Sequence, residues 1–94
     1  MGGILMALTL PEAKVLGLLS ALGRTTTAMA LAERTGLAES GVRSALRALK
    51  TRGLVSSGTT MPTYWQITAP GSSIIGQPCY REYRDHPRLT NGKA

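Results

Sequence analysis

Apolar side chains recur along this chain first at helical spacing and then with the alternation typical of strands. The first helical stretch has a broad apolar stripe, made of Val15, Leu16, Leu18, Leu19 and Leu22. We expect its helix to start after Thr9, because Thr9 and Glu12 have the spacing of a capping box and Pro11 suits a first turn. Gly23 is placed to end it, since glycine readily adopts the left-handed conformation found after helices.

Two further helices are predicted between residues 27 and 52. Thr27 is a natural N-cap for a short helix over Ala28–Thr35, and Gly36 suits the sharp turn that follows. A longer helix is expected from about Glu39 to Arg52, with apolar residues in one arc and polar residues opposite. The apolar arc comprises Val42, Ala45, Leu46 and Leu49. The polar side comprises Ser40, Arg43, Ser44, Arg47 and Thr51.

Strand character follows in Leu54–Ser57 and Thr63–Thr68, which are joined by a segment containing the turn formers Gly58 and Pro62. In the second strand, Trp65 and Ile67 are expected on one face and the residues between and before them on the other. Residues 24–26 are expected to add a single bridge to this hairpin. Residues 69–73 have the composition of a linker. The following Ile74 and Ile75 suit either the core or contact with another subunit.

The expected fold is therefore mainly α with a small β-hairpin, an α+β arrangement of three helices and a wing. Ninety-four residues suit one domain. We expect an N-terminal arm over residues 1–8, the folded domain over 9–71 and a C-terminal extension over 72–94.

The positive charge of the chain is concentrated on the predicted helix pair. The formal net charge is +6, and residues 24–52 hold six cationic side chains against two carboxylates. Residues 53–78 carry no charged side chain. Such a field favours a polyanion as partner, although a basic surface that only keeps the protein soluble would have the same composition.

Other classes of function find little support in the sequence. The single Cys79 excludes an internal disulfide, and no apolar run approaches the ~20 residues of a membrane span. The first residues lack the basic start of a secretory signal. The chain has no glycine-rich phosphate loop and no metal-ligand spacing, and His86 beside Asp85 suits solvent better than catalysis. We therefore expect no enzymatic activity, no cofactor, no metal site and no small-molecule ligand.

The candidate site is the polar side of the third helix. Arg43 and Arg47 lie one turn apart, and either can make a bidentate contact with guanine in a DNA major groove. The serines on the same side are expected at base edges or phosphates, and neighbouring polar residues at the DNA backbone. The full set of predicted DNA-binding residues is Arg24, Thr27, Ser40, Arg43, Ser44, Arg47, Lys50 and Thr60.

The order of helix, helix–turn–helix and hairpin resembles the winged helix–turn–helix superfamily. The matching core and turn positions are Leu31, Ala32, Gly36, Leu37, Val42 and Ala45. The phrase ALRALKTRGLV is similar to the end of a recognition helix entering the wing, and TYWQITAPG to the second wing strand of MarR-like bacterial regulators. The resemblance covers roughly residues 9–71. It implies a cytoplasmic, nucleoid-associated regulator of transcription, such as a repressor of bacterial or phage origin, that binds specific double-stranded DNA through the helix over 39–52.

Size and a second resemblance add further expectations. A single DNA-binding module makes few contacts, so a homodimer formed through Ile4–Leu8 or through Ile74 and Ile75 is one expectation. The chain also resembles the Z-alpha domains, which bind left-handed duplexes, because Pro62 and Trp65 fall on that family's wing positions. Its recognition helix differs, with arginines where that family has an Asn and a Tyr. A winged-helix module that binds a protein is the third alternative, favoured by the uncharged wing.

Overall fold

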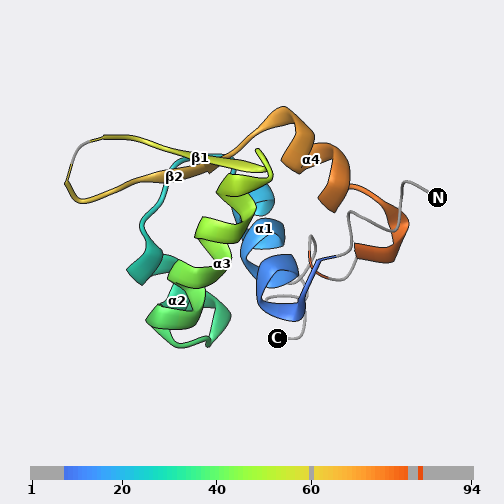
Figure 1. Ribbon diagram of the computed structural model, residues 1–94. Coiled ribbons are helices and arrows are strands. Elements are labelled where there is room, and N and C mark those ends of the chain that lie inside the picture. The colour runs from blue at the N-terminus through green and yellow to red at the C-terminus, as the bar shows by residue number, and fades with distance from the viewer. Residues whose placement is uncertain (1–7, 60, 81–82, 84–94) are drawn as a thin grey trace.

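The computed structural model describes residues 8–59, 61–80 and 83 of the chain. Three helices pack together, and a long hairpin projects from one side of them while a short fourth helix lies at its base (Figure 1). The elements in order are α1 (Leu10–Leu22), α2 (Ala28–Thr35), α3 (Glu39–Thr51), β1 (Val55–Ser57), β2 (Trp65–Ile67), α4 (Ala69–Ile75) and the 3-10 helix η2 (Pro78–Tyr80). The mainly α prediction with a small hairpin is confirmed. Thr60, the arm over residues 1–7 and most of the tail lie outside the described residues.

The start of α1 has the predicted capping box. The Thr9 hydroxyl accepts a hydrogen bond from the Glu12 backbone N–H at 3.3 Å, and Glu12 Oε1 accepts one from the Thr9 N–H at 3.0 Å. Glu12 is buried, and its Oε1 also lies 3.6 Å from Nη1 of Arg52 at the end of α3. One carboxylate therefore caps α1 and links it to α3. Gly23 ends the helix with a φ of 65°, as predicted.

The helix–turn–helix formed by α2 and α3 also begins and turns where the sequence indicates. The Thr27 hydroxyl accepts from the Ala30 N–H at 3.2 Å, and Gly36 has a φ of 78°. No side chain caps α3, because Ala38 occupies the N-cap position. Apolar residues from the three helices meet in one core. Its largest fully buried members include Leu16, Leu19, Leu31, Leu46 and Leu49.

The wing is a two-stranded antiparallel hairpin in which Val55 pairs with Ile67 and Ser57 with Trp65. Each strand has three residues and is shorter than predicted, because Leu54 belongs to the buried turn after α3 and Thr68 caps the next helix. Trp65 and Ile67 pack against the core while Gln66 is exposed, which confirms the predicted alternation. Thr26 forms the predicted single bridge, through two hydrogen bonds with Trp65 of 2.7 and 3.0 Å.

The linker expected at residues 69–73 is wrong, because α4 spans Ala69–Ile75. The Thr68 hydroxyl caps this helix by accepting from the Gly71 N–H at 3.1 Å, and it donates to the Gly53 carbonyl at 2.7 Å. Ile75 is fully buried in the core of this chain and Ile74 packs against it, so both take the core alternative. The expected division between residues 71 and 72 falls inside the helix.

The last described residues return to α1. The Leu8 N–H donates to the Tyr80 hydroxyl at 3.0 Å, so the two ends of the described chain meet. Gly17 allows the Tyr83 backbone to approach α1 closely, since a Cβ atom at position 17 would lie 2.5 Å from the Tyr83 carbonyl oxygen. Among the described residues, none of the helices has the length and apolar character needed to cross a membrane.

Candidate nucleic-acid interface

Helix α3 has two distinct faces in the structure, as its sequence predicts. Val42, Ala45, Leu46 and Leu49 are buried against the other helices, which fixes the orientation of α3. The opposite face is open to solvent and carries four polar residues of the predicted site. These are Ser40, Arg43, Ser44 and Arg47, all of them exposed. A rigid helix therefore presents hydroxyl and guanidinium groups outward from a fixed core.

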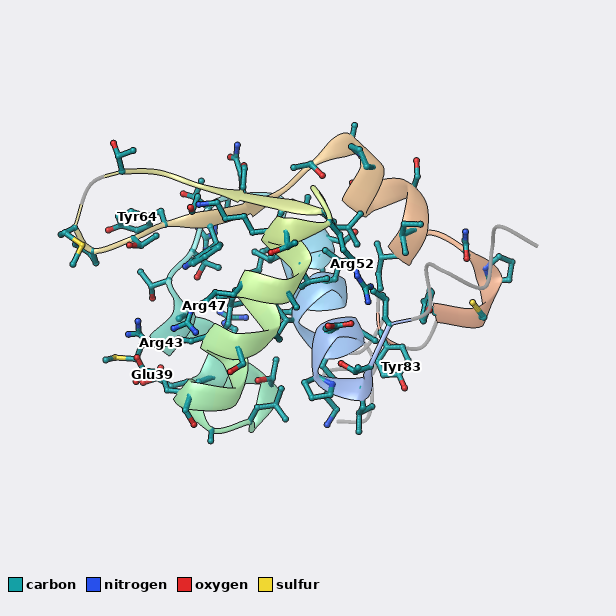
Figure 2. The ribbon with its side chains drawn as sticks, viewed as in Figure 1. Glu39, Arg43, Arg47, Arg52, Tyr64 and Tyr83 are labelled. Carbon is teal, nitrogen blue, oxygen red and sulfur yellow. The ribbon has the colours of Figure 1, made fainter. Side chains whose placement is uncertain are left out.

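Arg47 lies near the middle of this open face (Figure 2). Its guanidinium makes no hydrogen bond or ion pair with any other residue in the described part of the chain. Its backbone carbonyl accepts from the Thr51 hydroxyl at 3.0 Å, which helps to hold the last turn of α3. The five N–H donors of the Arg47 side chain thus remain available to an external acceptor.

Arg43, one turn earlier, has an acidic partner within its own helix. Its Nε and Nη2 atoms both donate to Oε2 of Glu39, at 3.1 and 2.5 Å. The two side chains are 58% and 39% exposed, so the pair lies in contact with water. The two arginines that the sequence treats as equivalent are therefore different, since only Arg43 must give up an ion pair to contact another molecule.

Lys50 connects α3 to the wing. Its Nζ atom donates to the Ser57 hydroxyl at 2.9 Å and lies 6.0 Å from the centroid of the Trp65 ring. The ammonium group is thus placed where the helix and the hairpin meet, and it remains exposed. This position suits the predicted contact with a DNA phosphate, and it also makes Lys50 a link that orients the wing.

The remaining predicted residues lie at different distances from this centre. Thr27 caps α2 and also lines a pocket together with Arg43. Arg24 is exposed in the loop between α1 and α2 and is not among the residues that line this pocket. Thr60 lies outside the described residues, so its predicted contact stays a prediction.

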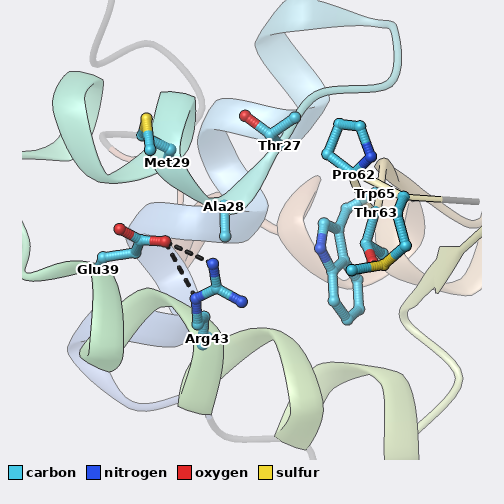
Figure 3. Close-up of a pocket in the computed structure, with 9 residues that line it drawn as sticks. Thr27, Ala28, Met29, Glu39, Arg43, Pro62, Thr63 and Trp65 are labelled. Carbon is cyan, nitrogen blue, oxygen red and sulfur yellow. Dashed lines mark hydrogen bonds and ion pairs between the residues drawn. The ribbon is translucent and has the colours of Figure 1, made fainter.

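The pocket that Thr27 and Arg43 share lies between the start of the helix–turn–helix and the wing (Figure 3), and has a volume of about 390 Å³. Its walls are largely apolar. They comprise Thr27, Ala28, Met29, Glu39, Arg43, Met61, Pro62, Thr63 and Trp65. Figure 3 shows Arg43 extended toward Glu39 and across the pocket from Trp65. The sequence gave no sign of a cavity here, because it forms only when the wing folds beside α2 and α3.

Two further residues matter more than their sequence pattern suggests. The spacing of Glu39 and Arg43 is that of a helical i, i+4 pair with the acid first, which is a signal that could have identified their contact. The exposure of Met29 depends on the packing of α2 and has no comparable signal. As for metals, the described residues hold no group of three or more His, Cys, Asp or Glu side chains that could bind an ion, and the exposed Cys79 is a free thiol.

The chain was compared with known families and structures. No family model and no curated protein matches it. Among solved structures it is similar to the zinc-responsive MarR family member ZitR of Lactococcus lactis, with a TM-score of 0.68 and 18% identity over 94% of this chain and 63% of that one. It is similar to ZitR in complex with DNA, with a TM-score of 0.68 and 21% identity over 94% and 58% of the two chains. It is also similar to the adhesin competence repressor AdcR of Streptococcus pyogenes, with a TM-score of 0.68 and 19% identity over 92% and 64%.

The likeness extends over nearly all of this chain but over part of each matched structure. The chain spans 58% to 64% of the length of the three structures. All three are bacterial proteins, and one of the matched structures was solved on DNA. The chain therefore has the winged helix–turn–helix fold seen in MarR-family regulators.

Proposed function

We propose that this chain is a regulator of transcription that binds specific sequences of double-stranded DNA by placing α3 in the major groove. The observation that carries the proposal is the open face of α3, where the Arg47 guanidinium has no partner within the described chain. A buried opposite face holds that guanidinium in a fixed position. The fold is also that of ZitR, which has been crystallised with DNA.

Each polar residue of the interface has a proposed role. Arg47 reads guanine through its O6 and N7 atoms, a bidentate contact that contributes ~1–3 kcal/mol of discrimination. Ser40 and Ser44 contact base edges or phosphates on either side of it. Lys50, Arg24 and Thr27 hold the DNA backbone and set the register, and Thr60 is proposed to contact a phosphate from the wing. The role of Arg43 is taken up below.

A second copy of the chain completes the proposal. Single DNA-binding modules bury roughly 600–1,000 Å² of protein surface, which limits their affinity. A homodimer would double these contacts and read two half-sites about one helical turn apart. A bacterial or phage repressor acting on the nucleoid is the corresponding cellular role.

The test is binding of the full chain to fluorescent duplex DNA, measured by anisotropy at 50 and 200 mM salt. Each cation that neutralises a phosphate should weaken binding about 3.5-fold over this range, so three such contacts predict roughly a 40-fold loss. The probes are a random duplex and the DNA that flanks the chain's own gene. Tighter binding to the flanking DNA would support sequence recognition. Absence of binding at low salt would refute the proposal.

A different observation favours a second candidate, a module that binds a protein. Met61 is 87% exposed, Met29 57% and Tyr64 44%, and the two methionines border the apolar pocket. Exposed apolar residues around a cavity are typical of interaction sites. A left-handed duplex, added as a third probe, tests the likeness to Z-alpha domains. Preference for that probe would replace major-groove reading, and failure of all three probes would favour the protein-binding role.

A further inference from the structure

The ion pair between Glu39 and Arg43 uses the part of Arg43 that a nucleic acid would need. Nε and Nη2 of Arg43 both donate to the same carboxylate oxygen of Glu39. Adjacent guanidinium N–H groups are also the ones that form bidentate contacts with guanine or phosphate. Glu39 and DNA therefore compete for the same donors, and Arg43 must leave Glu39 before it can read a base through them.

The pair is stable enough to matter and weak enough to open. Both side chains are exposed, and exposed helical pairs at this spacing contribute about 0.3–0.5 kcal/mol, or about twofold in an equilibrium. Arg43 also lines the open pocket of about 390 Å³, so its side chain has space to move once it is released. A DNA phosphate or guanine can thus displace Glu39 without disturbing the core.

We infer that Glu39 is a positioning residue that holds Arg43 away from DNA and so weakens binding, leaving Arg47 as the main base-reading arginine. The inference rests on the proposed function, since it concerns how the same face of α3 binds DNA. It gives the two arginines separate roles. Arg47 is ready to bind, whereas Arg43 contributes only after the exchange of an ion pair.

The central experiment compares Glu39→Gln with Glu33→Gln. Glu33 is an exposed residue of α2 without an ion pair in the described chain, so both variants lose one negative charge but only the first releases Arg43. Any gain from net charge should appear in both. We expect Glu39→Gln to tighten binding to duplex DNA by at least about twofold more than Glu33→Gln at 50 mM salt. This excess should shrink at 200 mM salt, because salt screens the pair.

The start of α3 needs its own control, since Glu39 lies in the first turn of a helix without a side-chain cap and favours its macrodipole. The double variant A38S/E39Q supplies a capping hydroxyl and keeps the helix start intact. Circular dichroism verifies that each variant is folded. The excess gain should persist in A38S/E39Q relative to Ala38→Ser.

A double-mutant cycle with Arg43→Gln identifies the partner of Glu39. In that background, the gain from Glu39→Gln should fall by about twofold, whereas the gain from Glu33→Gln should not change. Equal gains for both glutamates, or an undiminished gain without Arg43, would overturn the inference while leaving DNA binding established. Weaker binding by A38S/E39Q than by Ala38→Ser would overturn it too, because Glu39 would then contact DNA itself. Failure of every variant and of the wild type to bind would overturn both the proposed function and the inference.

Discussion

Gly71 in α4 tests whether the helix missed by the sequence prediction is held against the base of the wing. A Cβ atom at this position would lie 2.1 Å from the Leu54 carbonyl oxygen and 2.8 Å from Cγ1 of Ile67. The Leu54 oxygen cannot easily move, because it accepts from the Thr68 N–H at 3.1 Å while the Leu54 N–H is bound to Leu49. In Gly71→Ala, α4 would therefore have to shift by about 1 Å to reach the 3.0 Å limit of real contacts.

The magnitude follows from two opposing effects. Overpacking costs typically 1–3 kcal/mol, and the shift would weaken a hydrogen bond contributing about 1 kcal/mol. Alanine returns up to about 1 kcal/mol of helix propensity. We expect Gly71→Ala to lower the free energy of unfolding by about 2 kcal/mol, which lowers Tm by roughly 10 °C in a chain of this size.

Gly41→Ala is the matched control, because it is the same substitution in α3 at a site where a Cβ atom meets nothing within 4 Å. It should raise stability by about 0.5 kcal/mol through helix propensity. Thermal melts followed by circular dichroism, together with urea titrations, measure both variants. A Tm for Gly71→Ala equal to or above that of Gly41→Ala would refute the close packing of α4 on the turn after α3.

Three further substitutions test the core and the interface. Leu46→Ala should cost roughly 2–5 kcal/mol by opening a cavity at a fully buried position, and an unchanged Tm would show that α3 does not bury this face. Arg47→Ala should weaken specific binding by ~1–3 kcal/mol and non-specific binding less; equal losses would restrict Arg47 to phosphate contact. Lys50→Ala should reduce the magnitude of the salt slope by about 0.9 without altering sequence preference, and a changed preference would contradict its assignment to the backbone.

Features encoded over a few neighbouring residues were predictable from the sequence. Thr9 with Glu12, Thr27 and Gly36 act through bonds or dihedral angles within one turn of their own positions, and the helix boundaries they imply are confirmed. The two faces of α3 were predictable for the same reason. Their spacing alone separates Leu46 from Arg47.

Features that depend on distant residues were not predictable in the same way. The composition of α4 favours a loop, and the helix is stabilised instead by contact of Gly71 with Leu54 and by burial of Ile75. Its Thr68 cap was a local signal, but Gly71 and the serines after it outweighed that signal. The link between Lys50 and Ser57 and the pocket beside Trp65 form only when the wing docks. The different states of Arg43 and Arg47 follow from side-chain geometry, which hydrophobic periodicity does not describe.

The hydrogen bond between Leu8 and Tyr80 has a consequence for engineering this molecule. It brings the two ends of the described chain together beside α1, and Figure 2 shows Tyr83 on the side opposite Arg43 and Arg47. A glycine-serine linker joining two copies at these ends would start away from the groove-facing helix. Such tethering raises the effective concentration of the second copy, and avidity can then exceed single-copy affinity by about 10²–10⁴. A tandem fusion is therefore a direct route to a single-chain reader of paired half-sites.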